Sequence, residues 1–326
     1  MNSEEMIQKI QELKQVKEDL LAQIRKTIVG QDEVIDKVLI GLFANGHMLI
    51  EGVPGLAKTL LISTIAKALN LTFGRIQFTP DLMPSDITGS DILVTSRDSE
   101  RREFQYIKGP IFANLILADE INRTPPKTQA ALLQAMQEYQ VSSGNTTRPL
   151  DLPFIVMATQ NPIEQEGTYP LPEAQLDRFM LYINIDYPSY EEELTIVQNT
   201  TGVPQEEPLP LLSAEKILQY QAAIRTMPVS QHILEYAVKL ARSTRPGTPE
   251  SRPEITKWIN WGAGPRASQY LVLAAKARAA LNGRLTPAEE DIRAVASPVL
   301  THRVLVSFAA EAEGIKPSDI IKQLLS

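Results

Sequence analysis

The sequence contains no cysteine, and this absence excludes a disulfide framework, a thiolate nucleophile and a thiolate metal site. Histidine is also scarce: His47, His232 and His302 are scattered, without the spaced companions of a metal site. No apolar run approaches the ~18 residues that span a bilayer. The first residues also lack the apolar core of a secretory signal. These absences predict a cytoplasmic protein with no membrane span.

A surplus of basic charge is missing as well, since the formal net charge at pH 7 is −7. Nucleic-acid binding relies on an excess of Lys and Arg, so the overall charge disfavours a generic nucleic-acid coat. Residues 236–303 do hold eleven Lys or Arg against five acidic residues. The simpler interpretation is that these side chains face nucleotide, a neighbouring subunit or solvent. A nucleic-acid motor stays open as an alternative.

The first 200 residues alternate between two apolar patterns. Short apolar runs predict buried strands at residues 48–50, 75–78, 115–118, 154–158 and 181–185. Helical periodicity predicts helices at residues 3–26, 31–43, 59–69, 128–139 and 173–179. Alternating strands and helices indicate an α/β fold with a parallel sheet covered by helices on both faces. The helix at 3–26 is expected to pack on its own domain rather than to form a coiled coil.

Two segments depart from this alternation. Residues 91–108 are polar and weakly alternating, which predicts a hairpin inserted into the α/β frame at about residues 85–108. Residues 201–210 contain three prolines and predict a linker. Beyond it, helical periodicity dominates, at residues 214–224, 230–243, 268–282 and 287–296. We therefore expect an α/β domain at 1–200 and an all-helical domain at 201–326.

A phosphate-binding loop follows the first predicted strand and opens a helix. The loop consists of Gly52, Val53, Pro54, Gly55, Leu56, Ala57, Lys58 and Thr59. Its backbone N–H groups and the helix start form an anion site, and the two glycines let the backbone approach phosphate. Lys58 brings positive charge to the β- and γ-phosphates, and the Thr59 hydroxyl can coordinate Mg²⁺. Ala57 stands where the motif usually has glycine, which is tolerable if φ there stays negative.

Polar residues follow the later strands. Asp119 ends the third predicted strand at the carboxyl edge of the sheet, where it can hold the magnesium shell. Glu120, which points differently, can orient and activate the attacking water. Asn161 follows the next strand and can position a water or contact a γ-phosphate, although a loop cap is a serious alternative. Arg178 ends a predicted helix, where an exposed arginine is usually only a solvated charge.

Together these motifs resemble those of the MoxR-type AAA+ ATPases, over essentially the full chain. The resemblance rests on residues 52–59, 109–112, 117–123, 158–162 and 171–179, and on 252–255 and 264–268, which look like lid motifs. Ala57 matches the habit of this family. The resemblance implies an AAA+ P-loop core, with a parallel five-stranded sheet flanked by helices, and a C-terminal all-helical lid domain.

The resemblance also implies roles for single residues. Asn161 looks like the sensor on the strand beside the acidic pair, and Arg178 looks like an arginine finger that reaches the nucleotide of a neighbouring subunit. Arg266 looks like the second sensor, contacting the γ-phosphate from the lid. Val29, Gly30 and Gln31 resemble the segment that lines the adenine pocket. The implied ligands are ATP or ADP with Mg²⁺.

Members of this family usually form hexameric rings and act as chaperone-like remodellers. The resemblance suggests proteins with von Willebrand factor A domains as a partner class. We therefore expect an ATP hydrolase that remodels or matures protein partners. The alternatives are a nucleotide-gated adaptor with little turnover, a nucleic-acid motor of the same clade, and a magnesium-chelatase motor subunit. Glu120 and Arg178 argue against a pure adaptor, which needs neither, and the lid motifs argue against the chelatase subunit.

Overall fold

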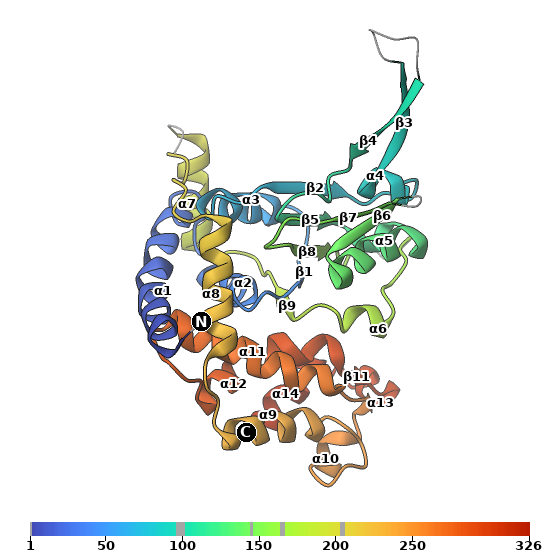
Figure 1. Ribbon diagram of the computed structural model, residues 1–326. Coiled ribbons are helices and arrows are strands. Elements are labelled where there is room, and N and C mark those ends of the chain that lie inside the picture. Colours follow the sequence, from blue (N-terminus) through green and yellow to red (C-terminus); the bar gives the residue numbers. More distant parts are fainter. Residues whose placement is uncertain (1, 96–101, 144–145, 164–166, 203–205) are drawn as a thin grey trace.

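The protein is described from a computed structural model that covers residues 2–95, 102–143, 146–163, 167–202 and 206–326. A five-stranded sheet in the order β2–β5–β8–β1–β9, with every neighbouring pair parallel, forms the centre of the core (Figure 1). Its strands are β1 (Met48–Glu51), β2 (Phe73–Gln77), β5 (Leu115–Asp119), β8 (Ile155–Gln160) and β9 (Leu181–Asn184). The predicted parallel sheet and its strands are therefore confirmed.

Helices cover both faces of this sheet because its central strands are apolar on both sides. The core helices are α1 (Ser3–Ile24), α2 (Asp32–Phe43), α3 (Lys58–Ala68), α5 (Pro126–Glu138) and α7 (Tyr190–Thr201). In β5, Leu115 and Leu117 share one buried cluster with α2 and α3. Ile116 and Ala118 alternate with them and share a second cluster with α5. This alternation follows from the two-residue period of a strand.

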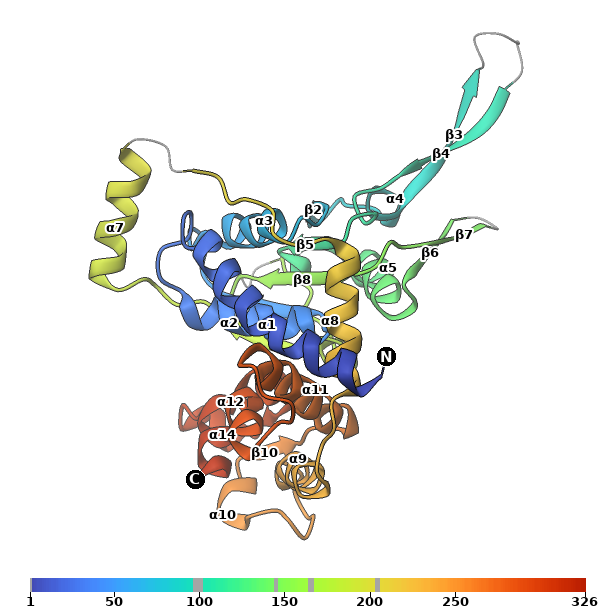
Figure 2. The same ribbon diagram turned by 60° about the vertical axis from the view of Figure 1, so that its left-hand side comes forward.

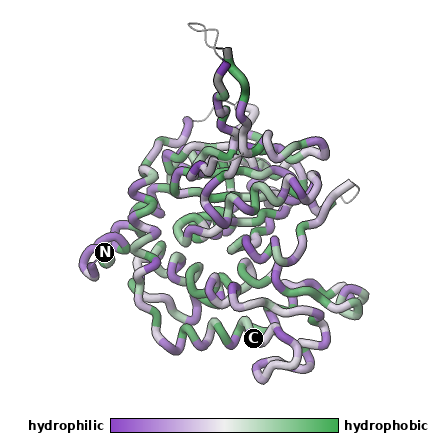
Figure 3. Tube along the Cα trace, turned by 45° about the vertical axis from the view of Figure 1, so that its right-hand side comes forward, coloured by the Kyte–Doolittle hydropathy of each residue, from purple (hydrophilic) through white to green (hydrophobic). Residues whose placement is uncertain are grey.

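The predicted inserted hairpin is present and projects from the core in both ribbon views (Figures 1 and 2). A short helix, α4 (Pro84–Thr88), leads into β3 (Gly89–Thr95), which pairs antiparallel with β4 (Arg102–Lys108). Residues 96–101 of the predicted hairpin lie outside the described residues. The tube coloured by hydropathy shows apolar as well as polar residues along the hairpin (Figure 3), among them the exposed Phe104.

Two local details differ from the sequence prediction. A second hairpin, β6 (Gln140–Ser143) with β7 (Thr146–Pro149), follows α5 and was not predicted, because its strands are short and mostly polar. The helix predicted at 173–179 ends early, as α6 (Glu173–Leu176). The chain turns after Leu176 because Phe179 is fully buried in the core at the entrance to β9.

The C-terminal part is helical, as predicted, apart from one small sheet. Its helices are α8 (Ala214–Thr226), α9 (Gln231–Ser243), α10 (Pro253–Thr256), α11 (Pro265–Leu281), α12 (Glu289–Leu300), η2 (Thr301–Arg303), α13 (Phe308–Ala312) and α14 (Pro317–Leu325). Two short antiparallel strands, β10 (Ile259–Trp261) and β11 (Leu305–Val306), were not predicted. The helix α12 contacts β9, so the lid lies against the edge strand of the core sheet.

The N-terminal helix α1 joins the two parts of the molecule rather than standing apart. Its buried apolar stripe contributes to the main core, and α1 packs against α3, α8 and α11. The helix α8 also binds the core, since Gln221 Nε2 donates to the Leu42 carbonyl at 2.8 Å and Lys216 pairs with Glu12 at 2.9 Å. The domain boundary at 200/201 stays a prediction; residues 203–205 of the predicted linker lie outside the described residues.

Two absences apply to the described part of the chain. No helix there is long and apolar enough to cross a membrane. The same residues contain no group of three or more His, Cys, Asp or Glu side chains arranged to hold a metal ion.

Candidate nucleotide-binding and ATPase site

The predicted phosphate-binding loop lies between the end of β1 at Glu51 and the start of α3 at Lys58. A Cβ at Gly52 would come within 2.9 Å of the Ile185 carbonyl oxygen, so the close approach of two backbone segments requires glycine. Gly55 has φ +87°, in the region that favours glycine. Pro54 and Gly55 are exposed at the outer turn of the loop, whereas Leu56 is buried.

Ala57 has φ +54°, which overturns the expectation that φ would be negative at this residue. The helix α3 therefore starts from a left-handed residue, the conformation that glycine would adopt without cost. The Ala57 side chain is exposed, so crowding of its methyl group does not add to the strain of the left-handed backbone. The motif usually has glycine at this position. In this chain an alanine adopts a backbone conformation that only glycine favours.

Lys58 is half-buried in the loop, and its ammonium donates to the carbonyl oxygens of Gly52 and, at 3.2 Å, Val53. Burial lowers the pKa of Lys58, and the negative charges of Asp119 and Glu120 oppose that shift. The loop cation and the two acids therefore lie close enough to interact. Thr59 is half-buried on the first turn of α3, beside Lys58 in the chain.

The acidic pair lies at the carboxyl end of β5, as predicted. Asp119 is 8% exposed, and its carboxylate accepts from Arg75 at 2.7 Å and from the Thr159 hydroxyl at 2.6 Å. Glu120 has φ +57°, and this left-handed backbone turns its side chain away from that of Asp119. Its carboxylate accepts from Gln77 at 3.0 Å and from Arg123 at 2.8 Å.

Thr159 is a functional residue that the sequence prediction missed. Its fully buried hydroxyl donates to Asp119 and accepts from the backbone N–H of Glu120 at 2.9 Å. One side chain of β8 thereby holds Asp119 and the backbone of Glu120 in place. Thr159 belongs to the 158–162 motif that includes Asn161, but its hydroxyl could not be assigned a partner before the two strands were known to be neighbours.

Asn161 is 6% exposed and lies just after the carboxyl end of β8, at the same sheet edge as the acids. Its Oδ1 accepts from the Ile163 N–H at 3.1 Å, which is the loop cap considered in the sequence. Its Nδ2 is buried and has no hydrogen-bond partner within the described residues. A buried donor without a partner is costly, so the second half of the amide fits a ligand or water contact.

A cavity of about 320 Å³ adjoins the phosphate loop at Ala57. Its lining combines the apolar residues Ile28, Val29, Leu60, Ile196 and Pro208 with polar and charged residues such as Lys67 and Glu206. The apolar part of this lining suits the flat base of a nucleotide. Gly30, with φ +66°, lies beside the cavity, where Glu192 of α7 leaves no room for a Cβ.

Gln31 also lines this cavity, in the segment with Val29 and Gly30 for which the resemblance implies an adenine pocket. It has φ +56°, and its side-chain Oε1 is buried without a hydrogen-bond partner in the described part of the chain. An amide with an unused acceptor at a cavity wall can accept from an exocyclic amino group of a base.

Arg178 and Arg266 lie together but not at this edge of the sheet. Both line a cavity of about 200 Å³ that also includes Gly46 and His47. Met180 donates to the His47 carbonyl at 2.7 Å, and β9 then runs parallel to β1 from Leu181. Arg178 therefore precedes the amino ends of these strands, whereas the phosphate loop follows the carboxyl end of β1.

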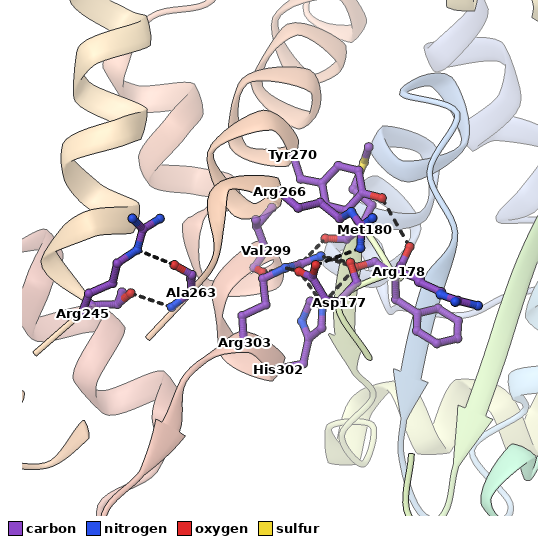
Figure 4. A network of polar contacts seen from close by, with 12 residues as sticks. Asp177, Arg178, Met180, Arg245, Ala263, Arg266, Tyr270, Val299, His302 and Arg303 are labelled. Carbon is purple, nitrogen blue, oxygen red and sulfur yellow. Dashed lines mark hydrogen bonds and ion pairs between the residues drawn. The ribbon is translucent and has the colours of Figure 1, made fainter. Parts of the chain in front are cut away.

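This arrangement limits which nucleotide Arg266 can contact. Strands of this length separate the two sheet edges by about 13 Å, so Arg266 does not reach the phosphate loop of its own chain from the lid. Instead, its guanidinium pairs with Asp177 at 2.9 Å (Figure 4). Arg178 Nη1 donates to the Leu133 carbonyl at 2.8 Å. The expected sensor thus lies beside the expected finger, and Arg266 does not line the cavity next to Ala57.

The residues at the carboxyl edge fit a nucleotide with Mg²⁺. The phosphate loop with its glycines and Lys58 suits phosphates. The hydroxyl of Thr59 and the carboxylate of Asp119 supply oxygen ligands of the kind that Mg²⁺ prefers. Two buried amide atoms at the site have no hydrogen-bond partner in the described chain. These unpaired atoms, the Nδ2 of Asn161 and the Oε1 of Gln31, lie where the γ-phosphate side and the base side of the site are expected.

Comparisons with known proteins agree with this geometry. Residues 47–181 match the ATPase family associated with various cellular activities (AAA), and residues 255–324 match the AAA lid domain. The chain is 43% identical over 308 residues to Chaperone MoxR1 of Mycobacterium tuberculosis, covering 94% of this chain and 80% of that protein. It is 34% identical over 301 residues to Protein MoxR of Methylorubrum extorquens, covering 87% of this chain and 86% of that protein.

A solved structure has the same fold over nearly the whole chain. The crystal structure of a candidate ATPase from Cytophaga hutchinsonii matches with a TM-score of 0.89 and 42% identity, covering 98% of this chain and 96% of that chain. The parallel sheet and the helical lid of this chain are thus the fold of a solved structure that shares 42% of its sequence. This protein belongs to the MoxR-type AAA+ ATPases.

Proposed function

We propose that this protein hydrolyses ATP with Mg²⁺ in a ring of identical subunits and uses the hydrolysis to remodel or mature protein partners. The observation that carries the proposal is the distance between the two arginines and the phosphate loop, which the reaction needs together. Arg178 and Arg266 lie at the amino edge of the sheet, while the phosphate loop lies at the carboxyl edge. A site that needs both parts requires a second subunit, so turnover depends on assembly.

The carboxyl edge would bind the nucleotide. The N–H groups of the phosphate loop and the ammonium of Lys58 would hold the β- and γ-phosphates. Thr59 and Asp119 would hold Mg²⁺, which neutralises charge that develops on the phosphate oxygens. The base would enter the cavity beside Val29 and Gly30, where Gln31 offers an acceptor.

The reaction needs a polarised water in line with the γ-phosphate. Glu120 would accept a proton from that water, because its side chain projects from the same edge as Asp119. The free Nδ2 of Asn161 would donate to the water or to a γ-phosphate oxygen. Both groups follow adjacent strands, β5 and β8, and the Thr159 hydroxyl of β8 binds the Asp119 carboxylate and the Glu120 N–H.

Arg178 and Arg266 would act on the nucleotide of the neighbouring subunit. Guanidinium groups stabilise the charge that spreads over the transferred phosphoryl oxygens. A ring in which each subunit offers its amino edge to the next site has a head-to-tail interface, and such interfaces close into rings. The hexamer is the number that the family resemblance suggests. A cytoplasmic location stays a prediction from the sequence.

Protein clients, including proteins with von Willebrand factor A domains, are the partner class that we propose. The chaperone name of the relative from M. tuberculosis supports this class. A nucleic-acid motor is less well supported, because several basic side chains of the lid already have acidic partners. Arg278 and Arg284 both pair with the buried Asp291, and Arg242 pairs with Glu250 at 2.9 Å.

The test is the ATPase rate per subunit as a function of protein concentration, with the assembly state followed by analytical ultracentrifugation. We expect the rate to rise as the assembly forms and then to reach a plateau. Glu120→Gln should assemble and bind ATP without turnover, and it can then be used to capture clients in ATP. A rate per subunit that stays constant across the dissociation range would contradict the proposal. DNA-stimulated, salt-sensitive hydrolysis would favour the motor instead.

A further inference from the structure

Arg303 is a buried lid arginine that contacts the core. It ends η2, directly after α12, and its side chain is 2% exposed. The guanidinium donates to the Asp177 carboxylate at 2.8 Å, to the Asp177 carbonyl at 2.9 Å and to the Phe179 carbonyl at 2.6 Å. The same group also donates to the Val299 carbonyl at 2.5 Å, within the lid. One lid side chain therefore binds the core segment on both sides of Arg178 (Figure 4).

Two further lid side chains hold the same segment. Arg266 pairs with the other carboxylate oxygen of Asp177, so that this aspartate lies between two lid arginines. The Tyr270 hydroxyl donates to the carbonyl of Arg178 at 3.4 Å. The segment 177–179 is thus bound by hydrogen bonds from α11 and from η2.

The segment is held from two sides. The core buries Phe179, and the Leu133 carbonyl accepts from Arg178. The preceding helix, α6, is only four residues long and contains no buried residue. The carboxylate of Asp177 and the carbonyls of residues 177–179 accept hydrogen bonds from the lid, so the lid shares in fixing the backbone around Arg178.

We propose that Arg303 is a positioning residue for Arg178: through Asp177 it fixes the finger to the lid, so that lid position in one subunit controls hydrolysis at the neighbouring site. This inference rests on the proposed trans role of Arg178. The requirement on Arg303 is geometric as well as electrostatic, because a guanidinium can donate in several directions at once and an ammonium cannot reach the same set of acceptors.

Arg303→Lys tests this requirement while keeping the charge. Misplacing a catalytic group by about 1 Å costs up to roughly 100-fold in rate, so we expect kcat to fall roughly 10- to 100-fold. The KM for ATP should stay within about twofold, because the phosphate loop is at the other edge of the sheet. The matched control is Arg293→Lys, at an exposed lid arginine that donates to the Leu325 carbonyl and contacts no core residue among those described; its kcat should stay unchanged.

Subunit mixing separates a positioning role from a general loss of structure. Arg303→Lys subunits have an intact nucleotide site and a misplaced Arg178. Glu120→Gln subunits have an inactive nucleotide site and a correctly placed Arg178. Mixed in equal amounts, they should recover up to about a quarter of the wild-type rate, because random assembly joins a good finger to a good site at that share of interfaces. Mixed with Arg178→Ala, Arg303→Lys should recover nothing, because both subunits then lack a working finger.

The outcomes distinguish this inference from the function on which it rests. If Arg178→Ala and Glu120→Gln recover no activity in a mixture shown to co-assemble, the trans role itself is wrong. If that pair recovers activity but Arg303→Lys also recovers activity with Arg178→Ala, only the positioning role is wrong. Should Arg303→Lys fail to fold, Asp177→Asn takes its place in the same mixtures. Failure of both variants to fold would assign Arg303 a purely structural role and overturn the proposal.

Discussion

Lys58 and Arg178 belong to one chain but lie at opposite edges of its parallel sheet, one after the carboxyl end of β1 and the other before the amino end of β9. Arg178→Ala should therefore bind ATP as the wild type does and lose most of its turnover, by roughly 10³-fold or more. Equilibrium binding of a fluorescent ATP analogue and steady-state ATPase rates measure the two effects. If Arg178→Ala lost both ATP binding and turnover, Arg178 would instead belong to the nucleotide site of its own subunit.

Lys58→Ala should weaken nucleotide binding itself. The ammonium is half-buried among loop carbonyls, where a charged hydrogen bond to phosphate is worth about 1.5–3 kcal/mol, which corresponds to roughly 10- to 100-fold in affinity. The control is Lys37→Ala, which removes a lysine paired with Glu33 on α2, and which should bind ATP normally. Unchanged affinity in Lys58→Ala would refute the assignment of the phosphate loop.

Ala57→Gly should stabilise the folded protein by up to about 1 kcal/mol. The left-handed backbone at Ala57 costs an alanine about 1–2 kcal/mol, and the greater freedom of glycine in the unfolded chain offsets part of that gain. Denaturant unfolding measures the change. The matched control is Ala44→Gly, at φ −78°, which should instead lower the free energy of unfolding. A destabilised Ala57→Gly would mean that the methyl group makes contacts worth more than the strain.

His47 should make stability depend on pH. Burial lowers the pKa of His47 to about 4, and the neutral ring joins the Met136 carbonyl to the Val156 N–H. Because the unfolded chain then binds more protons between pH 6.5 and 4, stability is complete above about 6.5 and is lost as pH falls toward 4. The full loss is on the order of 3 kcal/mol.

His47→Gln removes this titration while leaving a donor and an acceptor on the side chain. Comparing urea unfolding of the variant and the wild type at pH 7 and pH 5 isolates the contribution of His47. The pKa of His302 is also lowered, first by burial and then by the charge of Arg303, so part of the pH dependence should persist in the variant. Identical losses of stability in both proteins would contradict the assignment to His47.

The elements whose patterns are local could be predicted from the sequence. The strands from β1 to β9 in the core sheet were found because buried strands of a parallel sheet are apolar on both faces. The second hairpin, β6 with β7, was missed because its strands are short and polar. The helix after Pro172 was predicted too long because the burial of Phe179, which ends it, depends on a core that the local pattern does not describe.

The candidate site also has a part that could be predicted from the sequence and a part that could not. The phosphate loop, Asp119 and Glu120 were predictable because each is a contiguous motif attached to a strand end. The role of Thr159 was not predictable, because a hydroxyl gains a role only from partners on other strands. The negative φ expected at Ala57 was wrong, since the turn geometry of the loop outweighs the residue's own preference.

The sequence by itself predicted a phosphate loop and a place among the MoxR-type ATPases, because both inferences depend on residues adjacent in the chain. Only the tertiary structure decided where Arg178 and Arg266 lie. Their position at the amino edge, beside Asp177 and Arg303, depends on the strand order and on the docking of the lid against β9. Contacts between segments more than a hundred residues apart leave no periodic signal in the sequence. These contacts hold Arg178 and Arg266 at the sheet edge opposite the phosphate loop.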